Sequence, residues 1–294
     1  MGKGIYANLE QQIEALRRKS TETVSYKTQE RYWSAFRRFC EFTASKFRLQ
    51  NIKNISDKHL EAYIEHLKSQ GRGPSHIKTE LSGIRYVHDK IENARYKLSS
   101  NEKFGLPKRK FGGVDRSWTP QEYMKMREIA LQEGNTRAYH ILSLCRNAGL
   151  RIEEALKINR ATAEKALRTG IMHVIGKGGR PRDIKINNEV KKTLAEAMSN
   201  TPRGQKLFVL GNEKTHLVKK ELEKWMEQNR AEAQAPGRER PLTWHGLRHS
   251  YAKERYAFYR NVMKMDKIAA RKAVSAEIGH NRADVTVIYT GKED

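Results

Sequence analysis

Six chemically active side chains follow one another through the second half of this chain of 294 residues. They are two arginines, a lysine, two histidines and a late tyrosine: Arg151, Lys177, His245, Arg248, His280 and Tyr289. An arginine presents a planar fork of donors to two phosphate oxygens, and a phenol can attack phosphorus. Histidine and lysine can carry protons. In one pocket, these groups would hold and neutralise a phosphodiester, attack it and protonate the oxygen that leaves.

Each of these residues alone also has an ordinary structural explanation. Glu154 follows Arg151 by three residues, so either the two form a surface ion pair or Glu154 supports the arginine in a site. Lys177 lies in a glycine-rich turn, where exposed lysines are common, and the spacing of a phosphate-binding loop is absent. In the ordinary explanation, His280 is a structural histidine at the end of a helix and Tyr289 is one more half-buried tyrosine. Their order and combination favour a joint role.

A zinc site is the main alternative for the histidines. His245 and His249 are four residues apart and would share one face of a helix. The pattern His-Glu-x-x-His is absent, and the sequence offers no evident third ligand. Cys40 and Cys145 lie in apolar, helix-like segments without a Cys-x-x-Cys pair, which is typical of core packing. We therefore predict neither a metal nor any other cofactor.

The charge balance of the chain indicates a polyanionic partner. Lysine and arginine total 58 against 34 acidic residues, for a net charge of +24. Residues 1–112 carry 23 basic and 12 acidic residues, and residues 113–294 carry 35 and 22. Because basic side chains release counterions from phosphates, nucleic acid is favoured over the two alternatives, a merely soluble basic protein and an anionic membrane surface.

Features of membrane and secreted proteins are missing from the sequence. No apolar run approaches the roughly 18 residues of a membrane span. The first residues, Met1 to Tyr6, lack the apolar core of a secretory signal. We expect no membrane partner and an intracellular protein, cytoplasmic and associated with the nucleoid.

Apolar residues recur every three or four positions in the first hundred residues, which predicts helices. The predicted helices cover residues 4–19, 26–47, 57–67 and 77–91. Ser56 is the predicted N-cap of the third helix, and Ser75 is that of the fourth. We assign residues 1–100 to a helical domain. Residues 101–116, rich in Gly, Pro, Lys and Arg, are the predicted linker.

Residues 117–294 form the second predicted domain. Strands at 171–175 and 183–186 flank the turn 176–181. Helices are expected at about 120–133, 136–148, 188–199, 215–230, 243–259 and 265–278. The fold class is therefore mostly α, with a small β-hairpin in the second domain.

Basic residues outside the ordered set are candidate DNA contacts. The polar face of the fourth helix is either a solvated surface or a face laid against a DNA groove, and the basic cluster of the linker either crosses a phosphate backbone or is solvated. The candidates, including one in the hairpin turn, are Lys78, Arg85, Lys108, Arg109, Lys110 and Arg180.

The ordered set Arg, Lys, His-x-x-Arg, Gly-His and Tyr resembles the signature of the tyrosine recombinase, or phage integrase, family. The resemblance is strong over about residues 115–294 and weaker over residues 5–95. There, Tyr26 to Phe42 looks like part of a SAM-like core-binding domain. The resemblance implies a two-domain, C-shaped clamp on double-stranded DNA.

Roles for the matched residues follow from this resemblance. Arg151 and Arg248 would clamp the scissile phosphate, and Lys177 would protonate the leaving 5′ oxygen. Tyr289 would be the nucleophile. Preorganised cations of this kind stabilise the charge of the transition state, so the chemistry needs no metal.

Three further residues match the family pattern, and one segment departs from it. His245 is the first histidine of His-x-x-Arg, His280 lies at a position that is His or Trp, and Glu154 is the supporting acidic residue. Residues 258–264 are an apparent insertion. We reject three other tyrosines as nucleophile because they precede the Gly-His motif: Tyr251, Tyr256 and Tyr259.

The implied activity is site-specific DNA recombination, as in the integrases of mobile elements. The enzyme would cut one strand at a time, hold a 3′-phosphotyrosyl link and pass the strand through a Holliday junction. A homotetramer on two recombination sites would be the active assembly, with a directionality factor as a further candidate partner. A type IB topoisomerase, which shares the chemistry on one duplex, and a non-catalytic DNA-binding protein are the alternatives.

Overall fold

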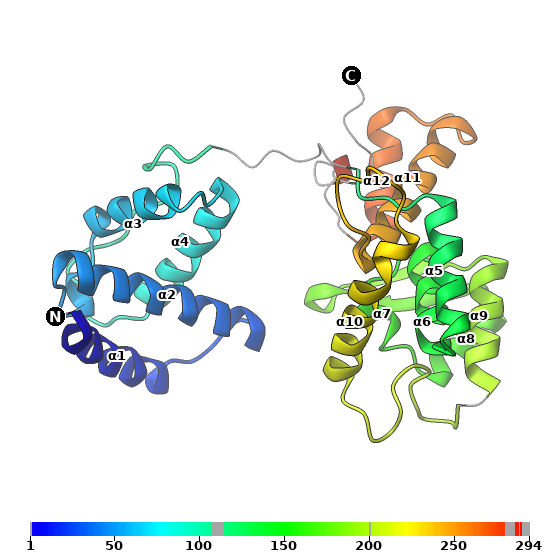
Figure 1. The fold of residues 1–294 in the computed structure, drawn as a ribbon, viewed down its shortest axis with the longest axis horizontal. Coiled ribbons are helices and arrows are strands. Elements are labelled where there is room, and N and C mark those ends of the chain that lie inside the picture. The colour runs from blue at the N-terminus through cyan, green and yellow to red at the C-terminus, as the bar shows by residue number, and fades with distance from the viewer. Residues whose placement is uncertain (1, 108–114, 200, 280–285, 288, 290–294) are drawn as a thin grey trace. The chain divides into compact units, whose positions relative to one another are not determined.

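The computed structural model describes residues 2–107, 115–199, 201–279, 286, 287 and 289. The chain divides into two units, Met1–Lys110 and Phe111–Asp294 (Figure 1). Each unit has a hydrophobic core of its own. Helices dominate both, and within the described ranges the second unit adds one antiparallel pair of strands. The predicted fold class is confirmed. None of the helices described is both long and apolar enough to span a bilayer.

Helices of the first unit pack around α2. The elements are α1 (Gly2–Lys19), α2 (Tyr26–Phe47), the short helix η1 (Ile52–Asn54), α3 (Asp57–Ser69) and α4 (Pro74–His88). α2 and α4 cross closely at Gly83, where an added Cβ would lie 3.0 Å from the Cβ of Ala35. This close crossing accounts for a glycine in the middle of a helix, where it otherwise costs stability.

The start of α4 differs from the predicted one. The N-cap is Gly73 and the first helical residue is Pro74, so Ser75, the predicted N-cap, lies inside the helix. Proline suits this position because an N–H there has no acceptor within the helix and because its φ is already helical.

Residues beyond α4 remain attached to the first unit. Leu98 and Leu106 are buried in its core. Lys78 donates from Nζ to the carbonyl of Pro107 at 2.8 Å. The segment predicted as a linker from residue 101 therefore packs on this unit as far as residue 107.

In the second unit, helices surround the hairpin. The elements are α5 (Pro120–Gln132), α6 (Thr136–Asn147), α7 (Ile152–Ala155), α8 (Arg160–Thr169), β1 (Ile171–Ile175), η2 (Lys177–Gly179), β2 (Pro181–Lys185), α9 (Asn188–Ser199), α10 (Thr215–Ala233), α11 (Trp244–Asn261) and α12 (Lys267–Glu277). The predicted helices are confirmed to within three residues at each end. The prediction has no counterpart for α7 and α8.

The hairpin places an arginine on the buried face of a strand. β1 and β2 pair with Val174 opposite Arg182 and Met172 opposite Ile184, and these four side chains are buried. β2 begins at Pro181, two residues before the predicted start, because the turn is tighter than predicted. Strand alternation then turns Arg182 toward the interior together with the apolar residues.

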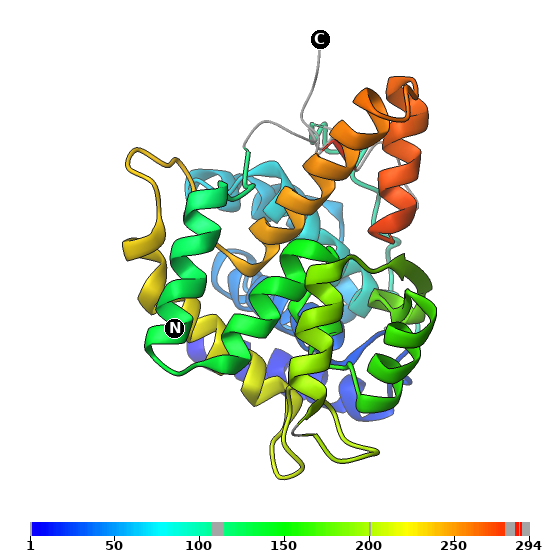
Figure 2. The same cartoon turned by 90° about the vertical axis from the view of Figure 1, so that its right-hand side faces the viewer.

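α11, which carries the His-x-x-Arg motif, packs against α12. Both helices are orange in Figures 1 and 2, and the loop that joins them lies away from the other helices of the unit. The apparent insertion, residues 258–264, forms the end of α11 and the start of this loop. It includes the exposed side chains of Val262 and Met263, while Tyr259 packs against the buried cluster shared by α11 and α12.

Candidate active site

Arg248 of α11 is fully buried. Its guanidinium donates to the carbonyl oxygens of Gly149 and Ile278, and so ties α11 to two segments that are distant in sequence. Loss of hydration, followed by the positive charge of Arg151, lowers the pKa of Arg248 to about 10. The guanidinium therefore remains charged at neutral pH and supplies a fixed cation below the surface of the site.

Glu154 of α7 holds the arginines of the site together. Its carboxylate is 4% exposed and accepts from Arg182 at 2.6 and 3.0 Å and from the Arg151 guanidinium at 2.7 Å, with Arg248 at 3.8 Å. Burial alone would raise the pKa of this carboxylate, but the hydrogen bonds and charge of Arg182, with further contributions from Arg151 and Arg248, lower it to about 2. Glu154 therefore stays ionised and offsets part of the positive charge.

Arg151 is the arginine of the site that remains open to solvent. Its N–H donates to Glu154 at 2.9 Å, so the same carboxylate fixes both its main chain and its guanidinium. The Arg151 side chain is 23% exposed, whereas that of Arg248 is 0% exposed. A phosphate that approached from solvent would therefore reach Arg151 first, with Arg248 behind it.

Gly149 brings the segment of Arg151 close to α11. Its φ is +60°, and an added Cβ would lie 2.4 Å from the ring of Tyr251. Only glycine fits both the left-handed conformation and the close approach. The Gly-Leu-Arg motif thus has a structural reason beside its chemical one.

His245 lies near these arginines, in the first turn of α11, and keeps an exposed edge. Partial loss of hydration and the charges of Arg248 and Arg151 lower the pKa of His245 to about 4. Because the imidazole is still exposed, repulsion by the guanidinium groups is the stronger reason. His245 is therefore neutral at pH 7 and able to accept a proton.

Tyr289 packs on the histidines of α11. It is helical and 5% exposed, and its ring centroid lies 4.4 Å from that of His249 and 5.9 Å from that of His245. It is near enough to Arg248 for a charge on its phenol oxygen to raise the pKa of that guanidinium. The structure thus gathers Arg151, Arg248, His245 and Tyr289 in the second unit.

The other two residues of the ordered set are only partly described or not at all. His280 lies outside the described residues. The backbone of Lys177 lies at the tip of the hairpin, in η2 between the two strands, and its side chain is outside the described part. Gly178 and Gly179 beside it have φ of +76° and +75°, which this tip requires. The hairpin that presents Lys177 is confirmed, and its contact with a substrate stays a prediction.

The predicted DNA contacts have varied surroundings. Arg180 is exposed at the hairpin. Arg85 is half-buried and donates to the carbonyl of Ser99 at 2.6 Å and to Asn101 Oδ1 at 3.0 Å, and Lys78 also bonds within the first unit. Both side chains therefore hold the segment after α4, a role that the sequence did not indicate. The basic cluster of the linker lies outside the described residues: Lys108, Arg109 and Lys110.

Two residues of the site are absent from the predicted set. Arg182 shares its strand face with Ile184, so the alternation of β2 is the signal that could have placed it inside. His249 is buried, and loss of hydration followed by the charge of His245 lowers its pKa to about 3. The sequence signal for His249 is its position four residues after His245. In the described part of the chain, no three His, Cys, Asp or Glu side chains gather as they would around a metal ion.

Comparison with protein families matches both units. A family model described as "Phage integrase family" matches residues 117–294. A second, described as "Phage integrase, N-terminal SAM-like domain", matches residues 9–98. The first alone covers more than half of the chain.

A curated relative is similar over nearly the whole chain. The tyrosine recombinase XerD of Halalkalibacterium halodurans is 22% identical over 281 residues, which cover 91% of this chain and 87% of the relative. Its length and that of this chain are therefore closely matched.

Several solved structures share the fold. A fragment of lambda integrase in a dimer bound to a COC′ core site has a TM-score of 0.65 at 17% identity, covering 98% of this chain and 96% of that chain. The Tn1549 transposon integrase in complex with circular intermediate DNA has a TM-score of 0.59 at 16% identity, covering 99% and 95%. A lambda integrase tetramer bound to a Holliday junction has a TM-score of 0.63 at 15% identity, covering 98% and 78%.

Proposed function

Because the chain belongs to the phage integrase family of tyrosine recombinases, we propose that it is a site-specific DNA recombinase that cuts and rejoins strands through a 3′-phosphotyrosyl intermediate. The observation that carries this proposal is the position of Tyr289, against His245 and near the buried Arg248. Attack by a phenol on a phosphodiester needs a fixed cation and a proton acceptor, and both lie beside this ring.

The two arginines bind the scissile phosphate. Arg151 contacts a non-bridging oxygen from its open side, and Arg248 supplies charge from below. Glu154 keeps the Arg151 guanidinium in place and the carbonyl oxygens of Gly149 and Ile278 keep that of Arg248 in place before DNA arrives. Little reorganisation is therefore needed when charge develops in the transition state. Each preorganised donor of this kind contributes on the order of 3 kcal/mol.

Cleavage then transfers the phosphoryl group to tyrosine. The Tyr289 oxygen attacks phosphorus while its proton passes to His245, whose pKa rises from about 4 when the negative phosphate binds beside it. The bond from phosphorus to the 5′ oxygen breaks, and Lys177 protonates that oxygen. His280 donates to a non-bridging oxygen. The phosphotyrosyl ester conserves the broken bond, so a 5′ hydroxyl of a partner strand reverses the reaction.

Strand exchange requires an assembly on DNA. Four protomers bind two duplex sites and exchange strands through a Holliday junction. Both halves of the chain are strongly basic, which suits contact with DNA from both units.

The recombination site has to be identified before the chemistry is tested. Cells that express the protein are lysed in denaturant, and DNA that remains attached to the protein is sequenced. A nicked suicide duplex with that sequence then traps the covalent adduct, because the short fragment between the cleavage site and the nick diffuses away with its 5′ hydroxyl and cannot religate.

Substitution of the tyrosine tests the proposal. Tyr289→Phe is expected to bind the nicked duplex but to form no covalent adduct. Tyr259→Phe is the matched control, because Tyr259 donates to Glu277 and lies outside the set of residues around Arg248; it should form the adduct. An adduct that persists in Tyr289→Phe would refute the assignment of the nucleophile. Relaxation of supercoiled plasmid by wild type without strand exchange would identify the topoisomerase alternative instead.

A further inference from the structure

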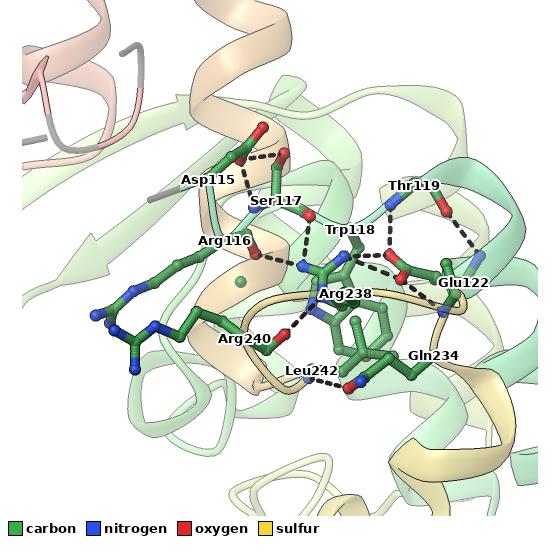
Figure 3. A network of polar contacts seen from close by, with 12 residues as sticks. Asp115, Arg116, Ser117, Trp118, Thr119, Glu122, Gln234, Arg238, Arg240 and Leu242 are labelled. Atoms are coloured by element: carbon green, nitrogen blue, oxygen red, sulfur yellow. Dashed lines mark hydrogen bonds and ion pairs between the residues drawn. The ribbon is translucent and has the colours of Figure 1, made fainter. Parts of the chain in front are cut away.

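A buried ion pair fastens the entry of the second unit to the loop before α11. Glu122 of α5 is 2% exposed, and both of its oxygens accept from Arg238, at 2.7 and 2.9 Å (Figure 3). The same carboxylate also accepts from the main-chain N–H groups of Thr119 and Ala235. Because every oxygen of Glu122 is engaged by donors from two distant segments, this junction is rigid.

The guanidinium of Arg238 also fixes the backbone at residues 116 and 240. Its Nε donates to the carbonyl of Arg240 at 2.8 Å, and one terminal nitrogen donates to the carbonyl oxygens of Ser117 at 2.7 Å and Arg116 at 3.3 Å. One planar group therefore bonds to the carbonyls of both Arg116 and Arg240, which keeps these two positions close together.

The first turn of α11 lies directly against this junction. An added Cβ at Gly246 would lie 2.6 Å from the carbonyl oxygen of Arg116 and 2.5 Å from Nε1 of Trp118. Trp118 is buried and donates from its ring to the carbonyl of Thr243 at 3.1 Å. The backbone of Arg116 is thus held beside the helix turn that carries His245.

The side chains of Arg116 and Arg240 are left exposed by this arrangement. In Figure 3 both extend away from the network on the same side of it. Neither guanidinium makes a hydrogen bond or ion pair with another described side chain, although the charge of Arg116 bears on both His245 and His249. Two cations without an anionic partner among the described side chains, held near each other and near the reactive residues, suit an anion from outside.

From this geometry we infer that Arg116 and Arg240 form a second phosphate clamp, which binds a backbone phosphate of the DNA next to the one that reacts. The inference rests on the proposed function, since it takes DNA as the ligand. Because every nucleotide of a DNA strand carries a phosphate, a cation close to His245 but outside the Glu154 cluster is suited to a phosphate next to the one that reacts. The clamp fixes the register of the strand without reading bases.

The salt dependence of DNA affinity tests the clamp, because it measures how many phosphates are neutralised. The full chain is titrated against a fluorescein-labelled duplex of random sequence over a range of NaCl concentrations. The variants are Arg116→Ala with Arg240→Ala, the same pair changed to Lys, and a control that removes two exposed charges of α8, Lys165→Ala with Arg168→Ala. Thermal melting confirms that each variant is folded.

The double alanine variant is expected to reduce the slope of log affinity against log salt by about 0.9, since that is the contribution of one phosphate contact. Both the lysine pair and the α8 control should keep the slope of wild type. If the double alanine variant keeps that slope as well, or if the α8 control loses as much, the clamp is refuted. A wild type without salt-dependent affinity would refute the proposed function itself, which distinguishes the two failures.

Discussion

Glu154 decides whether the arginines of the site can coexist. Arg182 and Arg248 are buried, Arg151 is partly so, and each repels the others. A buried charge without a partner is costly, whereas a hydrogen-bonded pair is tolerated. The carboxylate therefore stabilises an arrangement of positive charge that, under the proposed function, receives a phosphate.

Glu154→Gln is expected to lower the free energy of unfolding of the second unit by about 3–5 kcal/mol at pH 7, because it removes one partner of a buried ion pair. Urea denaturation followed by tryptophan fluorescence measures this loss. The matched control is Glu164→Gln, which removes the exposed partner of Arg160 at 2.9 Å and should cost only about 0.3–0.5 kcal/mol. Equal losses in the two variants would contradict the role given to Glu154.

The unfolding free energies of wild type and Glu154→Gln can also be compared at several pH values, and the direction of the expected change follows from the pKa of Glu154. The folded-state pKa of Glu154 is about 2, below its ordinary value of 4.5, so its stabilisation is present above pH 4.5 and is lost as pH falls toward 2. The stability difference between wild type and Glu154→Gln should therefore narrow below pH 4.5, by up to about 1.4 kcal/mol per pH unit. A difference that stays constant down to pH 3 would show that the carboxylate titrates normally.

At the scale of elements, strong periodicity and clear breakers made most helices predictable. α8 escaped because its buried face is made of Ala163 and Ala166, which give little hydrophobic contrast with their neighbours. The residues that begin and end α8 are nevertheless typical of helix ends. Asn159 caps it by accepting from the N–H of Thr162, and Gly170 ends it with φ of +71°.

For the candidate site, the sequence indicated which residues to consider but not the network of contacts among them. Order and spacing identified Arg151 and Arg248, which the structure brings together. The bond between Glu154 and Arg182 joins segments 28 residues apart, and it depends on where β2 begins. Because the predicted strand starts two residues later than β2, it left Arg182 between the turn and the strand, where burial would not be expected.

Gly149→Ala tests how the turn before α7 positions Arg151. The added Cβ would meet the ring of Tyr251 at 2.4 Å and would also hold a strained left-handed φ, so the second unit should lose roughly 3 kcal/mol or more. Gly170→Ala has a similar φ with nothing within 4 Å, so it should show the backbone cost alone, roughly 1–2 kcal/mol. Thermal or urea unfolding compares the two. Equal losses would mean that the approach to Tyr251 carries no cost.

At the scale of the whole molecule, charge and cores are distributed between two units. Residues 1–110 carry 23 basic and 12 acidic residues, and residues 111–294 carry 35 and 22. Each unit has its own core, so the division does not split a hydrophobic cluster. Composition by halves predicted this even distribution. The positions of the charges on each surface depend on packing, as the half-buried Arg85 shows.

If both units contact DNA, then each should bind it alone and the joined chain should bind it more tightly. The polypeptides 1–110 and 111–294 are compared with the full chain on one duplex at several NaCl concentrations. Because phosphate contacts add, the salt slope of the full chain should approach the sum of the two separate slopes. Its affinity should exceed that of either unit by about 100-fold or more, because the linker makes the second contact intramolecular. A first unit that folds cooperatively but shows no salt-dependent binding would mean that its excess of 11 positive charges serves another purpose, and that the second unit alone engages DNA.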